Sequence, residues 1–266
     1  MIPAAYITHW RSKAPWPTDA QVEQDLVLSR ALVLIFNSDI GDSLALRGGT
    51  AINKLLLKEP VRYSEDIDLV QLTPGPIGPF FDGIKYILNP WLGDPVRDIG
   101  ESTATLKYRF YSEIEPVVPL RLKIEINTRE HDHFLDLQPS EFSVNSPWFR
   151  GSSRVSTYEV EELMATKLRA LYQRSKGRDL FDLWLVILNS APDCTGILTI
   201  FRKYMELKGT VPSTSEFMDN LDKKLSDSAF TEDIKPLLRP GYEYDPEVAR
   251  NTVSEKLICK LDEEME

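Results

Sequence analysis

The sequence predicts an α+β protein in which a mixed sheet with helices is followed by a helical C-terminal domain. Three observations predict this class. Segments that alternate polar and apolar residues, as strands do, all fall before residue 155. Helical segments lie between them, and after residue 156 the apolar residues recur only at helical spacing. We therefore expect one domain at 1–155 and a second, helical domain at 156–266.

The composition is that of an ordinary globular protein. The chain has 266 residues, of which 42% are hydrophobic and 27% charged, which excludes a disordered tail or a coiled-coil rod. Two cysteines and three histidines argue against a disulfide scaffold or a multi-histidine metal centre. The net charge of −10 argues against nucleic-acid binding over the whole surface. Much of it lies in residues 211–266, which hold 7 Lys+Arg and 14 Asp+Glu.

The N-terminal residues lack the basic and apolar regions of a signal peptide. No apolar stretch reaches the roughly 18 residues that a membrane helix needs. We therefore expect a cytoplasmic protein that does not associate with a membrane.

The elements of the first domain follow from local patterns. Thr18-Asp19 is a helix-start signal, and helical spacing continues to residue 38. Gly48-Gly49 indicates a tight turn between a short strand and a helix that begins at Thr50. Leu120–Asn127 alternates strictly over eight residues, which strongly indicates a strand. The other expected elements are strands at 44–46, 66–72, 104–111 and 142–145 and a helix at 80–92.

The second domain contains apolar residues at three- and four-residue spacing throughout. This spacing predicts helices at 159–172, 178–188, 196–207, 215–225 and 247–261. We expect a helix to break near Gly177.

Gly48-Gly49-Thr50 lies between a predicted strand and a predicted helix. Two glycines let backbone N–H groups approach a phosphate without a Cβ in the way, and a helix N-terminus favours an anion. A lone Gly-Gly pair is more often only a turn, so this motif depends on the residues that accompany it.

Asp66 and Asp68 lie two residues apart on a predicted strand, so their side chains point to the same face. Two carboxylates on one face repel each other unless a cation lies between them. A hard cation such as Mg²⁺ suits such a pair, although an isolated Asp-x-Asp is more often a solvated strand face. Glu125 would supply a third carboxylate if its strand pairs beside that of Asp66 and Asp68, which would give a two-metal phosphoryl-transfer site.

Longer stretches around these residues resemble one family. Leu46-Arg-Gly-Gly-Thr-Ala-Ile-Asn53 and then Arg62-Tyr-Ser-Glu-Asp-Ile-Asp68 are similar to the AbiEii/AbiGii toxin family of nucleotidyltransferases. Residues 161–174 and then Arg178-Asp-Leu-Phe-Asp-Leu183 match the family's lysine-bearing helix and its Arg-Asp-x-x-Asp-Leu segment. The resemblance covers about residues 40–190.

The resemblance implies a nucleotidyltransferase-like fold and an enzyme that uses Mg²⁺ (or Mn²⁺) to transfer NMP from an NTP to an acceptor. It assigns the NTP phosphates to Gly48, Gly49, Thr50, Ser64 and Lys167. It assigns metal binding to Asp66 and Asp68, with Glu125 as the third candidate ligand. Lys167 and Asp182 would join Asp66 and Asp68 as catalytic residues, with the helical domain completing the cleft.

The resemblance also implies the toxin of a bacterial toxin–antitoxin or phage-defence system, with a cognate antitoxin encoded nearby. The 3′ end of tRNA is one candidate acceptor, and a small molecule or a protein, as in AMPylation, is the alternative. A catalytically decayed protein that binds a nucleotide or a partner is a further alternative, although Asp66, Asp68 and Lys167 are all retained. The segment 166–178 holds five basic residues and no acidic one, so it is either a patch facing phosphate or RNA or a solvated helix face.

Overall fold

The computed structural model describes residues 2–207 and 209–263. It divides the chain into two compact units, Met1–Tyr158 (unit 1) and Glu159–Glu266 (unit 2). The outer limits that the sequence suggested for the two domains, at 1 and 266, lie outside the described residues.

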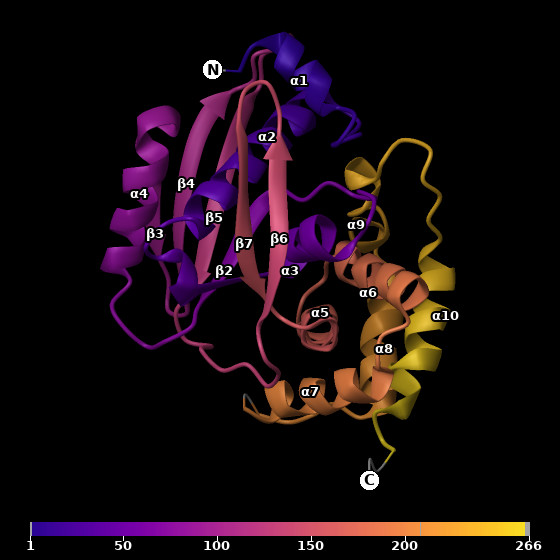
Figure 1. Ribbon diagram of the computed structural model, residues 1–266. Coiled ribbons are helices and arrows are strands. Elements are labelled where there is room, and N and C mark those ends of the chain that lie inside the picture. Colours follow the sequence, from indigo (N-terminus) through magenta and orange to yellow (C-terminus); the bar gives the residue numbers. More distant parts are fainter. Residues whose placement is uncertain (1, 208, 264–266) are drawn as a thin grey trace. The chain divides into compact units, whose positions relative to one another are not determined.

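Unit 1 is built around a mixed sheet whose strands run in the order β3-β4-β5-β2-β1-β7-β6 (Figure 1). Strands β2 and β5 pair in parallel, as do β1 and β7, while the other neighbours are antiparallel. This confirms the predicted α+β class. The strands are β1 Leu44–Arg47, β2 Asp66–Gln71, β3 Val96–Ile99, β4 Thr103–Tyr111, β5 Pro119–Asn127, β6 Gln138–Asn145 and β7 Arg150–Thr157.

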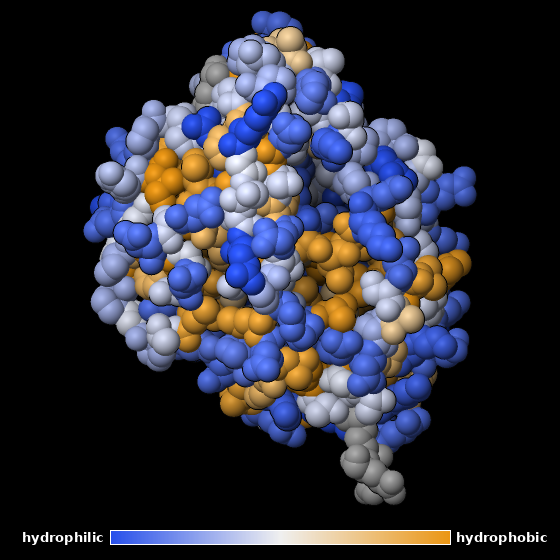
Figure 2. Space-filling view, in the orientation of Figure 1, coloured by the Kyte–Doolittle hydropathy of each residue, from blue (hydrophilic) through white to orange (hydrophobic). Residues whose placement is uncertain are grey.

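The central strands owe their positions to their apolar residues. On β5 the alternating Leu122, Ile124 and Ile126 are fully buried, as their spacing predicts. In β1 the first three residues are all buried, which fits a strand that is covered on both faces. The surface over β6 and β7, at the edge of the sheet, is mostly hydrophilic or neutral (Figure 2).

The helices of unit 1 are α1 Ala4–Trp10, α2 Asp19–Phe36, α3 Gly48–Ala51 and α4 Gly78–Leu92, and α3 continues into a π-helical segment, Ile52–Leu56. Helix α2 begins as predicted, because the Thr18 side chain and Gln21 form a capping box. Helix α2 packs on the sheet and contacts α4, which itself packs on β4. Both helices therefore cover the same face of the sheet (Figure 1).

A buried carboxylate ties the N-terminal segment to the rest of unit 1. Asp25 of α2 is 0% exposed. It accepts hydrogen bonds from the indole N–H groups of Trp10 at 2.8 Å and Trp16 at 2.9 Å. The ammonium of Lys54 lies 2.7 Å from each of its oxygens. Because a buried carboxylate needs such partners, Asp25 fixes α1 and the π-helical segment against α2.

A second polar side chain of α2 is held by aromatic rings. The guanidinium of Arg30 lies 4.2 Å from the ring centroid of Trp91 and 4.5 Å from that of Trp148. Such a geometry is attractive because the ring faces carry negative charge. Trp91 and Trp148 therefore pack around Arg30, whereas Trp10 and Trp16 are held by Asp25.

Glu23 of α2 predicts a pH dependence of stability. Its side chain is 1% exposed, and burial raises the pKa of Glu23 to about 7. Since this value lies above the ordinary 4.5, the cost of charging Glu23 is absent at low pH and complete above about pH 7. We expect Glu23→Gln to raise the free energy of unfolding by about 1–3 kcal/mol at pH 8 and to leave it unchanged at pH 4.

Denaturant unfolding of both proteins at the two pH values measures this difference. The glutamine can still accept the hydrogen bond that the backbone N–H of Glu113 donates to Glu23. An equal effect at both pH values would contradict a charge-based origin.

Unit 2 is helical, as predicted. Its α-helices are α5 Val160–Gln173, α6 Gly177–Ser190, α7 Cys194–Glu206, α8 Thr214–Leu225, α9 Ser228–Thr231 and α10 Pro246–Lys256. Helix α5 packs against α6 and α7, and α6 packs against α10. The predicted break near Gly177 is confirmed, because α5 ends at Gln173 and α6 begins at Gly177. Three short 3-10 turns, Gly41–Ser43 in unit 1 and Lys235–Leu237 and Ile258–Lys260 in unit 2, complete the described elements.

The structure corrects the sequence analysis in three places. Helices α1 and α9 and strands β3 and β7 were not predicted. Gly48-Gly49 forms the first turn of α3 instead of a separate turn before a helix at Thr50. The segment 247–261 is not one helix, because α10 ends at Lys256. Within the part of the chain that the structure describes, no helix has the length and apolar character needed to cross a membrane.

Candidate functional site

The register of β2 brings the predicted carboxylates of unit 1 together. Asp66 and Asp68 are both partly exposed while Ile67 between them is buried, which confirms that the two share a face. Strand β5 pairs beside β2, as the role suggested for Glu125 requires, and Glu125 lies directly opposite Asp68. Asp66 lies directly opposite Lys123.

The two glycines at the start of α3 lie against these groups. Gly48 has φ +75°, a left-handed conformation that favours glycine. A Cβ on Gly48 would lie 2.5 Å from a carboxylate oxygen of Asp68. A Cβ on Gly49 would lie 2.4 Å from a guanidinium nitrogen of Arg62 and 3.2 Å from Ser64 Oγ. Gly48 therefore allows the start of α3 to lie close to Asp68, and Gly49 lies close to Arg62 and Ser64.

The hydroxyl of Thr50 links the glycine motif to β2. Its Oγ1 lies 2.8 Å from Ser64 Oγ and donates a hydrogen bond to the backbone carbonyl of Asp66. Thr50 is completely buried. Thr50 thus holds Ser64 beside the carboxylate pair, whereas its assignment to the NTP phosphates stays a prediction.

Gly48→Ala is expected to destabilise the protein more than Gly49→Ala. The first change puts a Cβ on a residue with positive φ and against Asp68. We expect it to lower the free energy of unfolding by about 1–3 kcal/mol. The second change meets chiefly the end of the Arg62 side chain, which can shift. Urea unfolding of the two variants compares them directly, and the reverse order would show that Arg62 is the less movable neighbour.

Lys123 is a site residue to which the sequence analysis gave no role. Its Nζ lies 2.8 Å from Glu125 and 3.7 Å from Asp66. Burial alone would lower the pKa of Lys123, but the hydrogen bond to Glu125 and the charge of Asp66 outweigh it and raise that pKa. The signal was present, since Lys123 and Glu125 alternate onto one face of β5, but only the register with β2 shows that Lys123 meets Asp66.

Asp66 has the features of a cation ligand. Its Oδ1 is buried and has no hydrogen-bond partner within residues 2–207 and 209–263. Burial, with the nearby charges of Asp68 and Glu65, raises the pKa of Asp66 to about 6 despite the opposing charge of Lys123. A divalent cation would bind the unpartnered oxygen of Asp66 and reduce its repulsion with Asp68 and Glu65. No group of three or more His, Cys, Asp or Glu side chains among the described residues is arranged to hold a metal, and Glu125 as a ligand stays a prediction.

In unit 2, Lys167 and Asp182 belong to a buried ionic cluster. Lys167 of α5 is 5% exposed. Its Nζ lies 2.9 Å from Asp182 Oδ2 and 3.0 Å from Asp179 Oδ1, both on α6. Arg174 donates two hydrogen bonds to Asp179, at 2.7 and 2.9 Å. Burial would raise the pKa of Asp179, but the charge of Lys167 and the hydrogen bonds from Arg174 hold it well below its usual range.

The basic residues of segment 166–178 make contacts within unit 2, although Arg174 and Lys176 are exposed. Like Lys167, Arg169 is buried, and its guanidinium lies 4.8 Å from the ring centroid of Tyr204. Arg178 and Lys176 lie 3.0 and 3.8 Å from the carboxylate of Asp233. Intramolecular contacts within unit 2 therefore engage all five basic residues of this segment.

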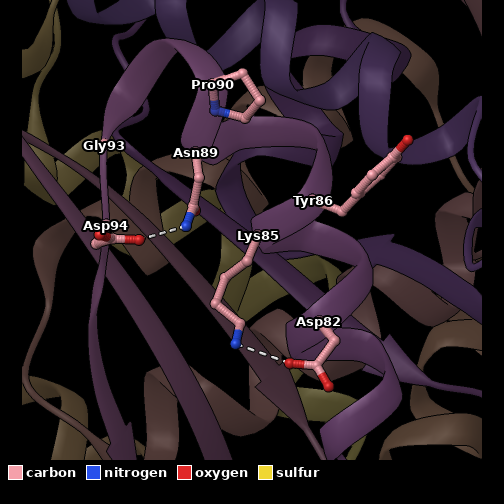
Figure 3. Close-up of a pocket in the computed structure, with 7 residues that line it drawn as sticks. All are labelled: Asp82, Lys85, Tyr86, Asn89, Pro90, Gly93 and Asp94. Atoms are coloured by element: carbon pink, nitrogen blue, oxygen red, sulfur yellow. Dashed lines mark hydrogen bonds and ion pairs between the residues drawn. The ribbon is translucent and has the colours of Figure 1, made fainter.

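An open pocket beside α4 lacks the features of a catalytic site. It measures about 630 Å³, and its polar side chains contact one another (Figure 3). Lys85 pairs with Asp82 at 2.7 Å, and Asn89 donates a hydrogen bond to Asp94 at 2.6 Å. These polar side chains already pair with one another, so we place the candidate catalytic site of unit 1 at the carboxylates of β2.

Comparisons with known proteins identify the family and the fold. The family model described as nucleotidyl transferase AbiEii toxin, type IV TA system, matches residues 30–256. MenT4, a nucleotidyltransferase toxin from Mycobacterium tuberculosis, is similar in structure with a TM-score of 0.68 and 18% identity, over 99% of this chain and 91% of that one. JHP933 from Helicobacter pylori gives a TM-score of 0.55 and 18% identity, over 93% and 95% of the two chains. No curated protein matches the sequence significantly.

Proposed function

Because the chain belongs to the AbiEii family of nucleotidyltransferase toxins, we propose that it transfers a nucleoside monophosphate from an NTP to a hydroxyl group of an acceptor. The hydroxyl oxygen bonds to the α-phosphorus, its proton is lost, and pyrophosphate leaves; Asp66 and Asp68 would hold the divalent metal ion. The observation that carries the proposal is the contact between the glycine motif and the carboxylates, where Gly48 leaves no room for a side chain beside Asp68. An NTP needs a backbone that phosphates can approach and a cation to bind them; in this proposal the glycine motif would provide the first, and Asp66 and Asp68 would hold the second.

The residues of unit 1 have separate roles in this proposal. Gly48 and Gly49 leave the backbone open to the phosphates, and Thr50 positions Ser64 beside them. Asp66 and Asp68 hold the metal through their oxygens, for which Mg²⁺ or Mn²⁺ is suited. When bound, the ion supplies positive charge to the triphosphate and orients it. Lys123 neutralises Glu125 and limits the repulsion among the three carboxylates.

The family name places the chain in a type IV toxin–antitoxin system, so a cognate antitoxin is its expected partner. We propose that the protein acts in the cytoplasm, where NTPs and tRNA are present, and that the 3′ end of tRNA is the acceptor. Transfer to a small molecule or a protein is the alternative outcome of the test.

The test incubates the purified chain with each α-labelled NTP and Mg²⁺, Mn²⁺ or EDTA. Total RNA, total protein and a small-molecule extract are the acceptors, offered separately. Metal-dependent label in tRNA supports the whole proposal, and label in protein or small molecules moves the acceptor to that class. Absence of label in all three fractions with either metal would overturn nucleotide transfer.

A further inference from the structure

A polar cavity of about 560 Å³ lies in unit 1, next to the glycine motif. It is lined by residues of α1, α2, the π-helical segment and β6, and Ser64 and Arg62 also line it. Ser64 connects this cavity to the candidate site, because its hydroxyl contacts Thr50, which in turn donates to the backbone of Asp66. We call it the α1–β6 cavity.

The charge of the α1–β6 cavity is opposite to that of the chain. Four basic residues line it, Lys13, Lys54, Lys58 and Arg62, against the carboxylates of Asp25 and Glu141. Two positive charges therefore remain in a protein whose net charge is −10. Lys13 and Lys58 are exposed and have no ion-pair partner among residues 2–207 and 209–263. Such a lining attracts an anion.

The cavity also holds a buried acceptor that lacks a donor. Asn53 is 7% exposed. Its Nδ2 donates to the backbone carbonyl of Gly49 at 2.8 Å, which fixes the orientation of the amide. Its Oδ1 has no hydrogen-bond partner within the described part of the chain. Because an unsatisfied buried oxygen is costly, a ligand that fits here should carry an N–H or O–H group as well as negative charge.

Three aromatic side chains also line the cavity. Trp10, Trp16 and Phe142 line the cavity, and the two indoles are fixed by their hydrogen bonds to Asp25. Aromatic side chains beside basic ones are a recurring surface for nucleotides, because the base packs on the rings while the cations bind the phosphate.

We propose that the α1–β6 cavity binds one nucleoside monophosphate unit of the acceptor, with its phosphate at Lys13 and Lys58 and a base or ribose donor at Asn53. This inference rests on the proposed function, since it names the class of acceptor that the same site would use. The unit could belong to a nucleic-acid strand or to a free nucleotide, and both sources share this chemistry.

The experiment uses the full chain carrying Asp68→Asn, so that binding is measured without turnover. The probes are AMP, CMP and a triribonucleotide with a free 3′ hydroxyl. The readout is the ¹H–¹⁵N NMR signal of each tryptophan indole, assigned with single Trp→Phe variants. We expect the signals of Trp10 and Trp16 to shift, while those of Trp91 and Trp148, which surround Arg30, stay in place.

The double variant Lys13→Glu/Lys58→Glu should weaken this binding by about tenfold or more, because it reverses both unpaired cations. Lys85→Glu/Lys107→Glu is the matched control, since it changes the net charge equally in unit 1 but outside the cavity, and its affinity should stay within about twofold. Tighter binding of the triribonucleotide than of AMP and CMP identifies a strand as the source. Equal binding identifies a free nucleotide, and either result supports the site.

No indole shift with any of the three probes, or equal losses in the two double variants, would overturn the inference. The labelling test on the wild-type chain separates it from the proposed function. Transfer without binding in the cavity would refute only the acceptor site. Binding in the cavity without any transfer would refute the proposed function and leave a nucleotide-binding site.

Discussion

Asp66→Asn and Asp68→Asn are each expected to lower nucleotide transfer by at least about 10³-fold. Each change replaces a charged oxygen ligand by a neutral amide of the same shape, so the metal loses part of its site while the fold is retained. Single-turnover transfer of labelled NMP measures the rate, and electron paramagnetic resonance of added Mn²⁺ measures the metal. Both variants should lose Mn²⁺ binding together with transfer.

Glu65→Gln is the matched control, because it removes a neighbouring charge that the proposal does not place on the metal. It should change transfer only a few-fold. Wild-type transfer rates in both Asp→Asn variants would end the metal proposal, whatever the control shows.

Asp66→Asn should also stabilise the protein when no metal is present. The pKa of Asp66 is about 6 in the folded chain, above its ordinary value of 3.8. Its charged form is therefore unfavourable above about pH 6 and the cost disappears as pH falls towards 4. We expect a rise in Tm of a few degrees at pH 8 and none at pH 4. A fall in Tm at pH 8 would show that the variant damages the fold, and its lost activity would then carry no weight.

Lys167→Met is expected to lower transfer by about 10²-fold or more, if the ammonium stabilises charge on the triphosphate as the family resemblance implies. It should also lower the free energy of unfolding by about 3–5 kcal/mol, since Asp179 and Asp182 are 0% exposed and would lose a common partner. Replacing a lysine that is merely exposed to solvent on a helix would have neither effect.

The loss of stability must be separated from the loss of chemistry. Asp179→Asn disturbs the same ionic cluster without removing the lysine, so it is the appropriate control. Lys176→Met is a second control, because Lys176 is half exposed and its ammonium lies 3.8 Å from Asp233, outside the cluster of Lys167. Transfer is compared at a temperature where all variants are folded by circular dichroism. Equal transfer by Lys167→Met and Asp179→Asn would make Lys167 a structural residue.

Local patterns predicted those parts of the site that depend on one segment. The alternation around Ile67 was enough to place Asp66 and Asp68 on one face, and the glycine at 177 was enough to predict where α5 and α6 separate. The role of Lys123 could not be predicted in this way, because it depends on pairing between β2 and β5, in which Lys123 lies opposite Asp66, 57 positions earlier in the chain (123 − 66). The burial of Lys167 likewise depends on how α5 packs against α6.

Strand β7 shows why some elements carry no local signal. It contains mainly Ser, Arg, Gly and Thr, and its buried residues are Ser153, Val155 and Thr157. Its position is determined by partners on both sides, namely β6 and β1. Polar strands of this kind are stabilised by backbone pairing and by single contacts, such as the hydrogen bond from Thr157 to Leu46 O, so hydrophobic periodicity does not reveal them.

The place of β7 in the sheet also sets an order of events during synthesis. Strand β1 precedes the glycine motif and pairs with β7, which is the last strand of unit 1 to leave the ribosome. The hydrogen bond from Thr157 to Leu46 joins residues that are 111 positions apart in the chain. Pairings so distant in the chain form late and slowly. A nascent chain therefore completes this sheet only after residue 157 has emerged, and fragments released earlier lack the finished scaffold around Asp66 and Asp68. We therefore expect a chain that ends before β7 to show no nucleotide transfer in the labelling test.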